Sequence, residues 1–158
     1  MSIEKVREYL RGYGLEEKIQ EFPVSSATVE LAAQAVGCEP GRIVKTLSFS
    51  VNEKPILIAA AGDAKVDNAK YKARFGVKAK MLKHEDAPVL IGHAVGGVCP
   101  FAVNEGVEVY LDISMKRFDL VYPAAGSSNS AVGLTIAELE KASNFVDWVD
   151  VCKAWQEE

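Results

Sequence analysis

The chain has 158 residues and a formal net charge of −4; 49% of its residues are hydrophobic and 25% are charged. These values are typical of one globular domain over residues 1–158, and they exclude a small protein that needs disulfides or metals to fold. No apolar run approaches the roughly 20 residues that cross a bilayer, and the charged N-terminus does not resemble a secretory signal, so we expect a cytoplasmic protein without a membrane partner.

The first half of the chain alternates helical and extended patterns. Apolar residues at helical spacing, candidate N-caps at Ser25, Ser26 and Thr28, and terminating glycines at Gly12 and Gly37 locate two of the helices. The predicted elements are a helix over 3–10, a strand over 19–22, a helix over 29–36, a hairpin of strands 43–51 and 55–62, and a helix over 67–75. The second hairpin strand is apolar on both faces, so we expect it at the centre of a sheet.

The second half mixes the same two patterns around a glycine-rich loop. The predicted elements are a strand over 77–82, a helix over 85–91, the loop over 92–100, strands over 107–111 and 120–125, a helix that opens on a capping box at Thr135 and Glu138, a strand over 145–149 and a short terminal helix. Many connections are too short for crossover helices. We therefore predict a single mixed α/β domain with several antiparallel strand pairs.

Charge is distributed unevenly along the chain. The 65–83 stretch carries a net charge of +6, whereas the remainder carries −10. Such a stretch attracts phosphates while the acidic remainder resists non-specific binding, although a solvated helix face beside a basic strand gives the same pattern. Its basic residues are Lys65, Lys70, Lys72, Arg74, Lys78, Lys80 and Lys83.

Lys45 is the most informative single residue. Alternation within the 43–51 strand places it on the same face as Ile43, Leu47 and Phe49. An ammonium on an apolar face is costly to desolvate unless it has a partner or opens into a cleft, which makes Lys45 a candidate for a functional site. The alternative is that Lys45, near the strand start, extends its ammonium to water.

The segment Gly96-Gly-Val-Cys-Pro-Phe101 is a second candidate. Adjacent glycines let the main chain approach a ligand and can present amide groups to an oxyanion, although ordinary loops also contain such sequences. The Asp63 carboxylate after the 55–62 strand and the 126–130 loop could also contact a ligand. A plain turn is the alternative for each of them.

The three cysteines, Cys38, Cys99 and Cys152, form no CxxC pair and are consistent with reduced thiols. Cys99 could act as a nucleophile with His84 or His93, but free cysteines are more often small buried apolar residues. The spacing of these residues also argues against a zinc site, so we expect no metal and no other cofactor.

Four motifs occur in the same order as in a known protein family. They are Arg42-Ile-Val-Lys-Thr-Leu47, Ala61-Gly-Asp63, Gly96-Gly-Val-Cys-Pro-Phe101 and Ala125-Gly126. Over roughly residues 28–144 the chain resembles the YbaK/EbsC family, also described as the prolyl-tRNA synthetase-associated editing domain. The resemblance implies an α/β fold with a curved mixed, largely antiparallel sheet flanked by helices.

The resemblance also implies a reaction: a free-standing deacylase hydrolyses the ester that joins a wrong small amino acid, such as Cys or Ala, to tRNA, with tRNA-Pro expected. It gives Lys45 and the amides of Gly96 and Gly97 the catalytic roles. The expected substrate-binding residues are Thr46, Asp63, Val98, Cys99, Pro100, Phe101, Gly126 and Ser127. The expected tRNA contacts are Lys65, Lys70, Lys72, Arg74, Lys78 and Lys80.

The expected partners are therefore aminoacyl-tRNA and a prolyl-tRNA synthetase, with neither DNA nor membrane involved. Two alternatives stay open on the sequence. A tRNA-binding or regulatory module could keep the fold without the reaction, and a hydrolase could depend on Cys99.

Overall fold

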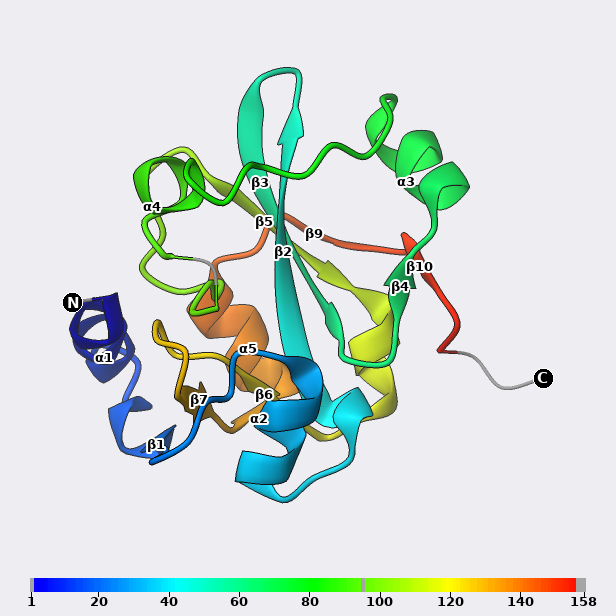
Figure 1. The fold of residues 1–158 in the computed structure, drawn as a ribbon. Coiled ribbons are helices and arrows are strands. Elements are labelled where there is room, and N and C mark those ends of the chain that lie inside the picture. The colour runs from blue at the N-terminus through cyan, green and yellow to red at the C-terminus, as the bar shows by residue number, and fades with distance from the viewer. Residues whose placement is uncertain (1, 95, 156–158) are drawn as a thin grey trace.

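The computed structural model describes residues 2–94 and 96–155, and its centre is a six-stranded mixed sheet with the order β8-β6-β2-β3-β5-β9 (Figure 1). The strands of this sheet are β2 (Ile43–Val51), β3 (Lys54–Ala61), β5 (Glu108–Asp112), β6 (Leu120–Pro123), β8 (Leu134–Thr135) and β9 (Asp147–Val149). Two short antiparallel pairs lie outside it: β1 (Ile19–Glu21) with β7 (Ser130–Val132), and β4 (Lys65–Val66) with β10 (Cys152–Lys153).

Capping residues mark the starts of three of the α-helices. In chain order, the α-helices of the described residues are α1 (Ser2–Arg11), α2 (Val29–Val36), α3 (Asn68–Phe75), α4 (Ala87–Leu90) and α5 (Ile136–Ser143). The side chains of Thr28, Asp67 and Thr135 each accept a hydrogen bond from a main-chain N–H in the first turn. Gly37 and Gly76 end α2 and α3 with positive φ angles, as C-terminal glycines commonly do. Short 3-10 turns cover Glu16–Lys18, Pro40–Arg42 and Ile113–Arg117.

The long β2–β3 hairpin organises the sheet. Its two-residue turn has positive φ at both Asn52 and Glu53, which matches the right-handed twist of the flanking strands. From Ile56 to Ala61, β3 is buried, because β2 and β5 cover its two edges and side chains cover both faces. The expected central position of this strand is confirmed.

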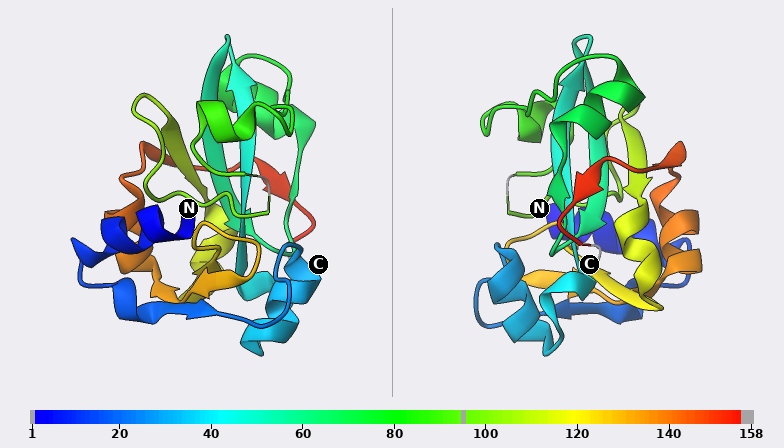
Figure 2. Two further views of the ribbon diagram at one scale, coloured as in Figure 1. Left: turned by 60° about the vertical axis from the view of Figure 1, so that its left-hand side comes forward. Right: turned by 90° about the vertical axis from the view of Figure 1, so that its right-hand side faces the viewer.

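The sheet combines parallel and antiparallel pairs, as predicted. β2 pairs antiparallel with β3 and parallel with β6, and β3 and β9 both run parallel to β5. Figures 1 and 2 show the β2–β3 hairpin upright through the centre of the molecule, whereas β6 and β7 run across its base. The sheet is therefore curled, and the α/β fold with a curved mixed sheet is confirmed.

Two predicted elements are wrong. The 77–82 segment forms a single bridge, from Met81 to Phe49, and no strand, because it bonds to the main chain of β2 only at Ser48 and Ser50. The short terminal helix is replaced by β10, in which buried Cys152 and exposed Lys153 alternate beside β4. The helix predicted over 85–91 shortens to α4.

Candidate functional site

Along part of one edge, β2 has no neighbouring strand in the described part of the chain, and this gap forms the candidate site. β6 pairs with only the first two residues of β2. Further along, the 80–82 segment bonds to the main chains of Ser48 and Ser50, at 3.0 and 2.8 Å. Among the described residues, no strand lies beside residues 45–47 on this edge, while β3 covers the other edge.

The main chain of Thr46 faces the gap. Main-chain groups alternate between the two edges of a strand, and Ser48 and Ser50 direct theirs toward the 80–82 segment. Thr46 precedes Ser48 by two residues, so its N–H and C=O point to the same edge. The buried Oγ1 of Thr46 also has no hydrogen-bond partner in the described part of the chain. The gap therefore offers a ligand both a main-chain donor and a main-chain acceptor.

A cavity of about 260 Å³ opens at this gap. Its walls come from the start of α2, from β2, from the 81–84 segment, from the glycine-rich loop, and from residues of β6 and β7. The apolar side chains of Val44, Leu47, Leu82 and Val98 contribute to the lining. An apolar cavity with a few polar groups is typical of a small-ligand site.

Lys45 lines this cavity and is half-buried. Among the described residues, no hydrogen bond or ion pair engages its ammonium. Burial lowers the pKa of Lys45 from its ordinary value, whereas Cys152 and Asp63 act in the opposite direction. A cation that is poorly solvated and has no strong partner can bind a carbonyl or anionic oxygen of a ligand. The cavity thus brings together Lys45, Thr46, Gly96 and Val98, four of the residues predicted for the site.

The glycine-rich loop reaches the cavity through Gly96, which has a φ of +100°. Gly97 packs behind it: a Cβ at this position would lie 2.8 Å from the main chain of Gly126 and Ser127. Gly97 is therefore required for a close approach of two loops. The 126–130 loop in turn supports the cavity wall, because Ser127 Oγ lies 2.7 Å from the Oγ of Ser130, a lining residue.

The remaining predicted loop residues lie elsewhere. Phe101 is fully buried in the core, and Pro100 lines a second cavity of about 660 Å³ beside α1. Gly97, Cys99, Gly126 and Ser127 do not line the first cavity either. Structurally, these residues position the loop that carries Gly96 and Val98.

Cys99 and His93 form a buried pair whose arrangement does not suit nucleophilic catalysis. The Cys99 Sγ and His93 Nε2 atoms are 3.7 Å apart, and Nε2 lies 2.7 Å from the carbonyl oxygen of Phe101. An Nε2–H that donates to this carbonyl cannot accept the thiol proton. Burial raises the pKa of the Cys99 thiol to about 12 and lowers the pKa of His93. The geometry therefore favours a neutral core thiol.

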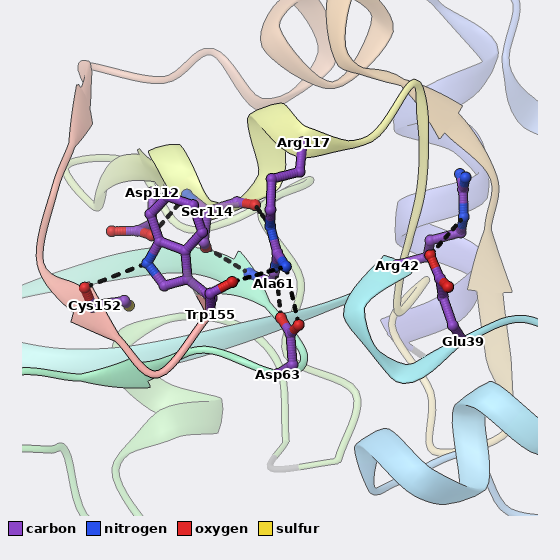
Figure 3. A network of polar contacts seen from close by, with 9 residues as sticks. All are labelled: Glu39, Arg42, Ala61, Asp63, Asp112, Ser114, Arg117, Cys152 and Trp155. Carbon is purple, nitrogen blue, oxygen red and sulfur yellow. Dashed lines mark hydrogen bonds and ion pairs between the residues drawn. The ribbon is translucent and has the colours of Figure 1, made fainter. Parts of the chain in front are cut away.

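Asp63 lies outside the cavity, in a polar network at the end of β3 (Figure 3). Arg117 donates to both of its carboxylate oxygens and also to the main-chain oxygens of Ser114 and Trp155. The Arg117 guanidinium holds the pKa of Asp63 below its usual value, with a smaller contribution from Lys45. Asp63 thus influences Lys45 through its charge and does not contribute to the lining.

The basic 65–83 stretch divides into paired and unpaired cations. Lys70 bonds to Asp150 at 3.1 Å, and Arg74 lies 3.6 Å from Asp147 and stacks on aromatic rings. The ammonium groups of Lys65, Lys72, Lys78, Lys80 and Lys83 are exposed and make no ion pair with another described residue. These five lysines can therefore bind phosphate groups more readily than Lys70 and Arg74 can.

Several cavity residues were not predicted as site residues from sequence. Thr28 and Val29 reach it from the start of α2, and Tyr122 reaches it from β6. Met81 and His84 reach it from the segment that bonds to β2. Only the sheet order places these residues beside Lys45, and no short sequence motif contains that information. The described residues include no cluster of three metal-ligating side chains and no helix that could span a membrane.

Comparison with known proteins identifies the family. The profile of the family described as "Aminoacyl-tRNA editing domain" matches residues 24–142. The chain belongs to the aminoacyl-tRNA editing domain family. A solved structure described as "a putative trans-editing enzyme for prolyl tRNA synthetase" superposes with a TM-score of 0.87 at 30% identity, covering 96% of this chain and 97% of that one.

Two relatives match the chain over different lengths. The uncharacterized protein YwhH of Bacillus subtilis (strain 168) is 48% identical over 157 residues, which cover 99% of this chain and all of YwhH. A proline–tRNA ligase of Bacillus cytotoxicus is 29% identical over 85 residues, or 53% of this chain and 15% of the ligase. The domain therefore resembles both a separate chain of the same length and a small part of a synthetase.

Proposed function

We propose that this protein is a trans-acting deacylase that hydrolyses the ester between a wrong, small amino acid and its tRNA, with tRNA-Pro as the expected carrier. The observation that carries this proposal is the half-buried Lys45 ammonium, without an ion-pair partner in the described chain, in a cavity at the open edge of β2. Membership in the editing domain family and the similarity to part of a proline–tRNA ligase support the reaction class.

Lys45 binds the ester in this proposal. Its ammonium polarises the carbonyl oxygen or holds the terminal phosphate, and the interaction strengthens as negative charge develops on the oxygen. The low solvation that lowers the pKa of Lys45 also makes such an interaction stronger than it would be in water.

Main-chain groups around the gap complete the site. The N–H of Thr46 faces the cavity, and the amides of Gly96 and Gly97 belong to the loop that enters it. Such groups stabilise an oxyanion without reorganising during the reaction. The carbonyl of Thr46 is suited to accept a hydrogen bond from the α-ammonium of the amino acid.

Water serves as the nucleophile. It adds to the ester carbonyl, the tetrahedral oxyanion collapses, and the ribose oxygen leaves with a proton, giving free amino acid and tRNA. We assign the activation of water to the substrate itself, through the neighbouring ribose hydroxyl or, for cysteine, its own thiol. This assignment agrees with the position of the Cys99–His93 pair, which is buried outside the cavity lining.

The size of the cavity suits the removal of small amino acids. A synthetase pocket separates side chains that differ by one methylene by only about 10- to 200-fold, so a second, smaller site improves fidelity. A volume of about 260 Å³ that must also receive part of the ribose leaves room for a small side chain.

Hydrolysis of a panel of aminoacyl-tRNAs tests the proposal. Wild-type protein should hydrolyse one or two mischarged species, such as Cys or Ala on tRNA-Pro, and leave correctly charged Pro-tRNA-Pro intact. If no member of the panel is hydrolysed while tRNA binding persists, the reaction is wrong and a non-catalytic tRNA-binding module becomes the better account.

A further inference from the structure

One part of the cavity rim has no role in the ester chemistry described above. It is formed by the 78–84 segment, which we call the rim segment. This segment is anchored to β2 by two main-chain hydrogen bonds, from Ser50 N to Lys80 O at 2.8 Å and from Leu82 N to Ser48 O at 3.0 Å. It is therefore a firmly held platform at the mouth of the site.

Two side chains of the rim segment, Met81 and His84, are exposed and also line the cavity. Met81 is 56% exposed, although it is a large apolar residue, and it lines the same cavity as Lys45. His84 is also exposed and also lines this cavity. A flexible thioether and an aromatic ring at the mouth of a cavity suit a flat, partly apolar ligand group.

The positive charge along the rim segment favours a ligand that carries phosphate groups. Lys78, Lys80 and Lys83 are exposed and make no ion pair within the described chain. The acidic pair Glu85 and Asp86 follows directly and limits the positive strip to the rim. An exposed aromatic ring among cations is a pattern that binds single-stranded nucleic acid, in which bases stack on the ring and phosphates pair with lysines.

The distance along β2 between the level of Thr46 and the level of Met81 matches the length of one nucleoside. Met81 lies opposite Phe49, three residues beyond Thr46, and a strand rises about 3.3 Å per residue, so roughly 10 Å separates the two levels. A nucleoside whose ribose ester lies at Lys45 and Thr46 would extend its base toward Met81 and His84.

We propose that Met81 and His84 form a stacking platform for the terminal base of the tRNA 3′ end, with the unpaired lysines of the rim segment on the preceding phosphates. This inference rests on the proposed function, because it takes the ester to lie at Lys45. The platform gives the site an interaction with the nucleotide that is separate from its interaction with the amino acid.

Binding of the uncharged trinucleotide CCA tests the platform without any reaction. The double variant Met81→Ser/His84→Ser should bind CCA about tenfold more weakly or worse, because base stacking is removed. His84→Phe should retain most of the affinity, because a phenyl ring also stacks. Val89→Ser is the matched control: Val89 is apolar and 74% exposed but does not line the cavity, so this variant should bind like wild type.

Hydrolysis of two esters separates this inference from the proposed function. Wild-type protein should prefer an aminoacyl-adenosine over the same amino acid esterified to a simple diol, and the double variant should lose most of that preference. Undetectable CCA binding by wild type, or unchanged CCA affinity in the double variant, would overturn the platform. Platform-dependent CCA binding without hydrolysis of either ester would instead support the platform and contradict the deacylase.

Discussion

Arg117 and Asp63 form a two-pronged ion pair at the end of β3, with Nη1–Oδ2 and Nη2–Oδ1 distances of 3.0 and 2.6 Å. The guanidinium carbon also lies over the rings of Phe118 and Trp155, at 4.7 and 5.1 Å from their centroids. One arginine thus joins the turn after β3 to the C-terminal segment. Asp63, in this turn, lies three residues after Ala60, the β3 residue opposite Lys45.

Replacing Arg117 should therefore destabilise the fold. Arg117→Met is expected to lower the free energy of unfolding by about 1–2 kcal/mol, because the ion pair and the stacking on both rings are removed. Urea denaturation measures this change. Arg11→Met is the control, because Arg11 pairs with Glu8 and Glu16 on the exposed surface, so its replacement should change the stability much less than Arg117→Met does.

The Arg117–Asp63 ion pair should make the stability of the protein depend on pH in the acidic range. Arg117 holds the folded-state pKa of Asp63 below 3.8, so the pair stabilises the protein fully above that value. The contribution is lost as the pH falls through the lowered pKa. The difference in stability between wild type and Arg117→Met should therefore shrink below about pH 3.8, and a difference that grows in acid would contradict this account of the pair.

Cys99 should be chemically inert in the folded protein. It is fully buried, and its thiol has a pKa raised to about 12, so iodoacetamide at about pH 8 should modify the more accessible Cys38 first. Mass spectrometry of the labelled peptides measures the order. Cys99→Ala should retain deacylation and cost about 1 kcal/mol of stability. Loss of activity in Cys99→Ala, with the fold intact, would favour the cysteine-dependent alternative.

Gly97 should not tolerate a side chain. A Cβ there would lie 2.8 Å from main-chain atoms of Gly126 and Ser127, so Gly97→Ala must separate the two loops. We expect a loss of about 1–3 kcal/mol in stability, and reduced deacylation because Gly96 moves with the loop. Thermal unfolding and single-turnover assays check both effects. Gly12→Ala is the control, since its Cβ would meet only Tyr9 O at an ordinary 3.4 Å.

The unpaired lysines should dominate tRNA binding. Lys78→Ala/Lys80→Ala should weaken tRNA binding and reduce the slope of log K against log salt by about 0.7–0.9 for each phosphate that is no longer neutralised. Lys70→Ala should have a smaller effect, because Lys70 already bonds to Asp150 and the Cys152 carbonyl. Binding titrations across salt concentrations measure the slopes. Equal slopes for wild type and the double variant would show that Lys78 and Lys80 do not contact tRNA phosphates.

Local signals in the sequence predicted much of the fold. The capping box at Thr135 and Glu138 and an N-cap at Thr28, one of three candidates in the sequence, fix helix starts through hydrogen bonds within four residues, and both are present. The terminal strand β10 was missed because its partner, β4, lies more than 80 residues earlier. A two-residue strand has too little pattern of its own to reveal such a pairing.

The candidate site was predicted only in part, because some of its residues come together through contacts between distant segments. Lys45 stood out because one strand places an ammonium among apolar residues, which is a local signal. Met81 and His84 join Lys45 only because the 80–82 segment returns to β2. The Asp63–Arg117 pair likewise spans 54 positions of the chain, so the sequence alone could not distinguish a ligand-binding carboxylate from an internal ion pair.

The pH dependence of Lys45 follows from its burial. Its folded-state pKa lies below 10.5, so unfolding takes up protons between the two values, and the free energy of unfolding should rise with pH across that window. Urea denaturation at a series of pH values measures this rise. Lys45→Met should lack it and be more stable than wild type at neutral pH.

Single-turnover hydrolysis of mischarged tRNA-Pro by wild type and by Lys45→Met measures whether the Lys45 ammonium acts in catalysis. The methionine keeps most of the side-chain volume and removes only the charge, so denaturation curves can establish that the fold is intact. We predict a rate at least about 10²-fold lower in Lys45→Met, with tRNA binding largely retained. If a folded Lys45→Met variant hydrolyses the ester at the wild-type rate, Lys45 has no catalytic role.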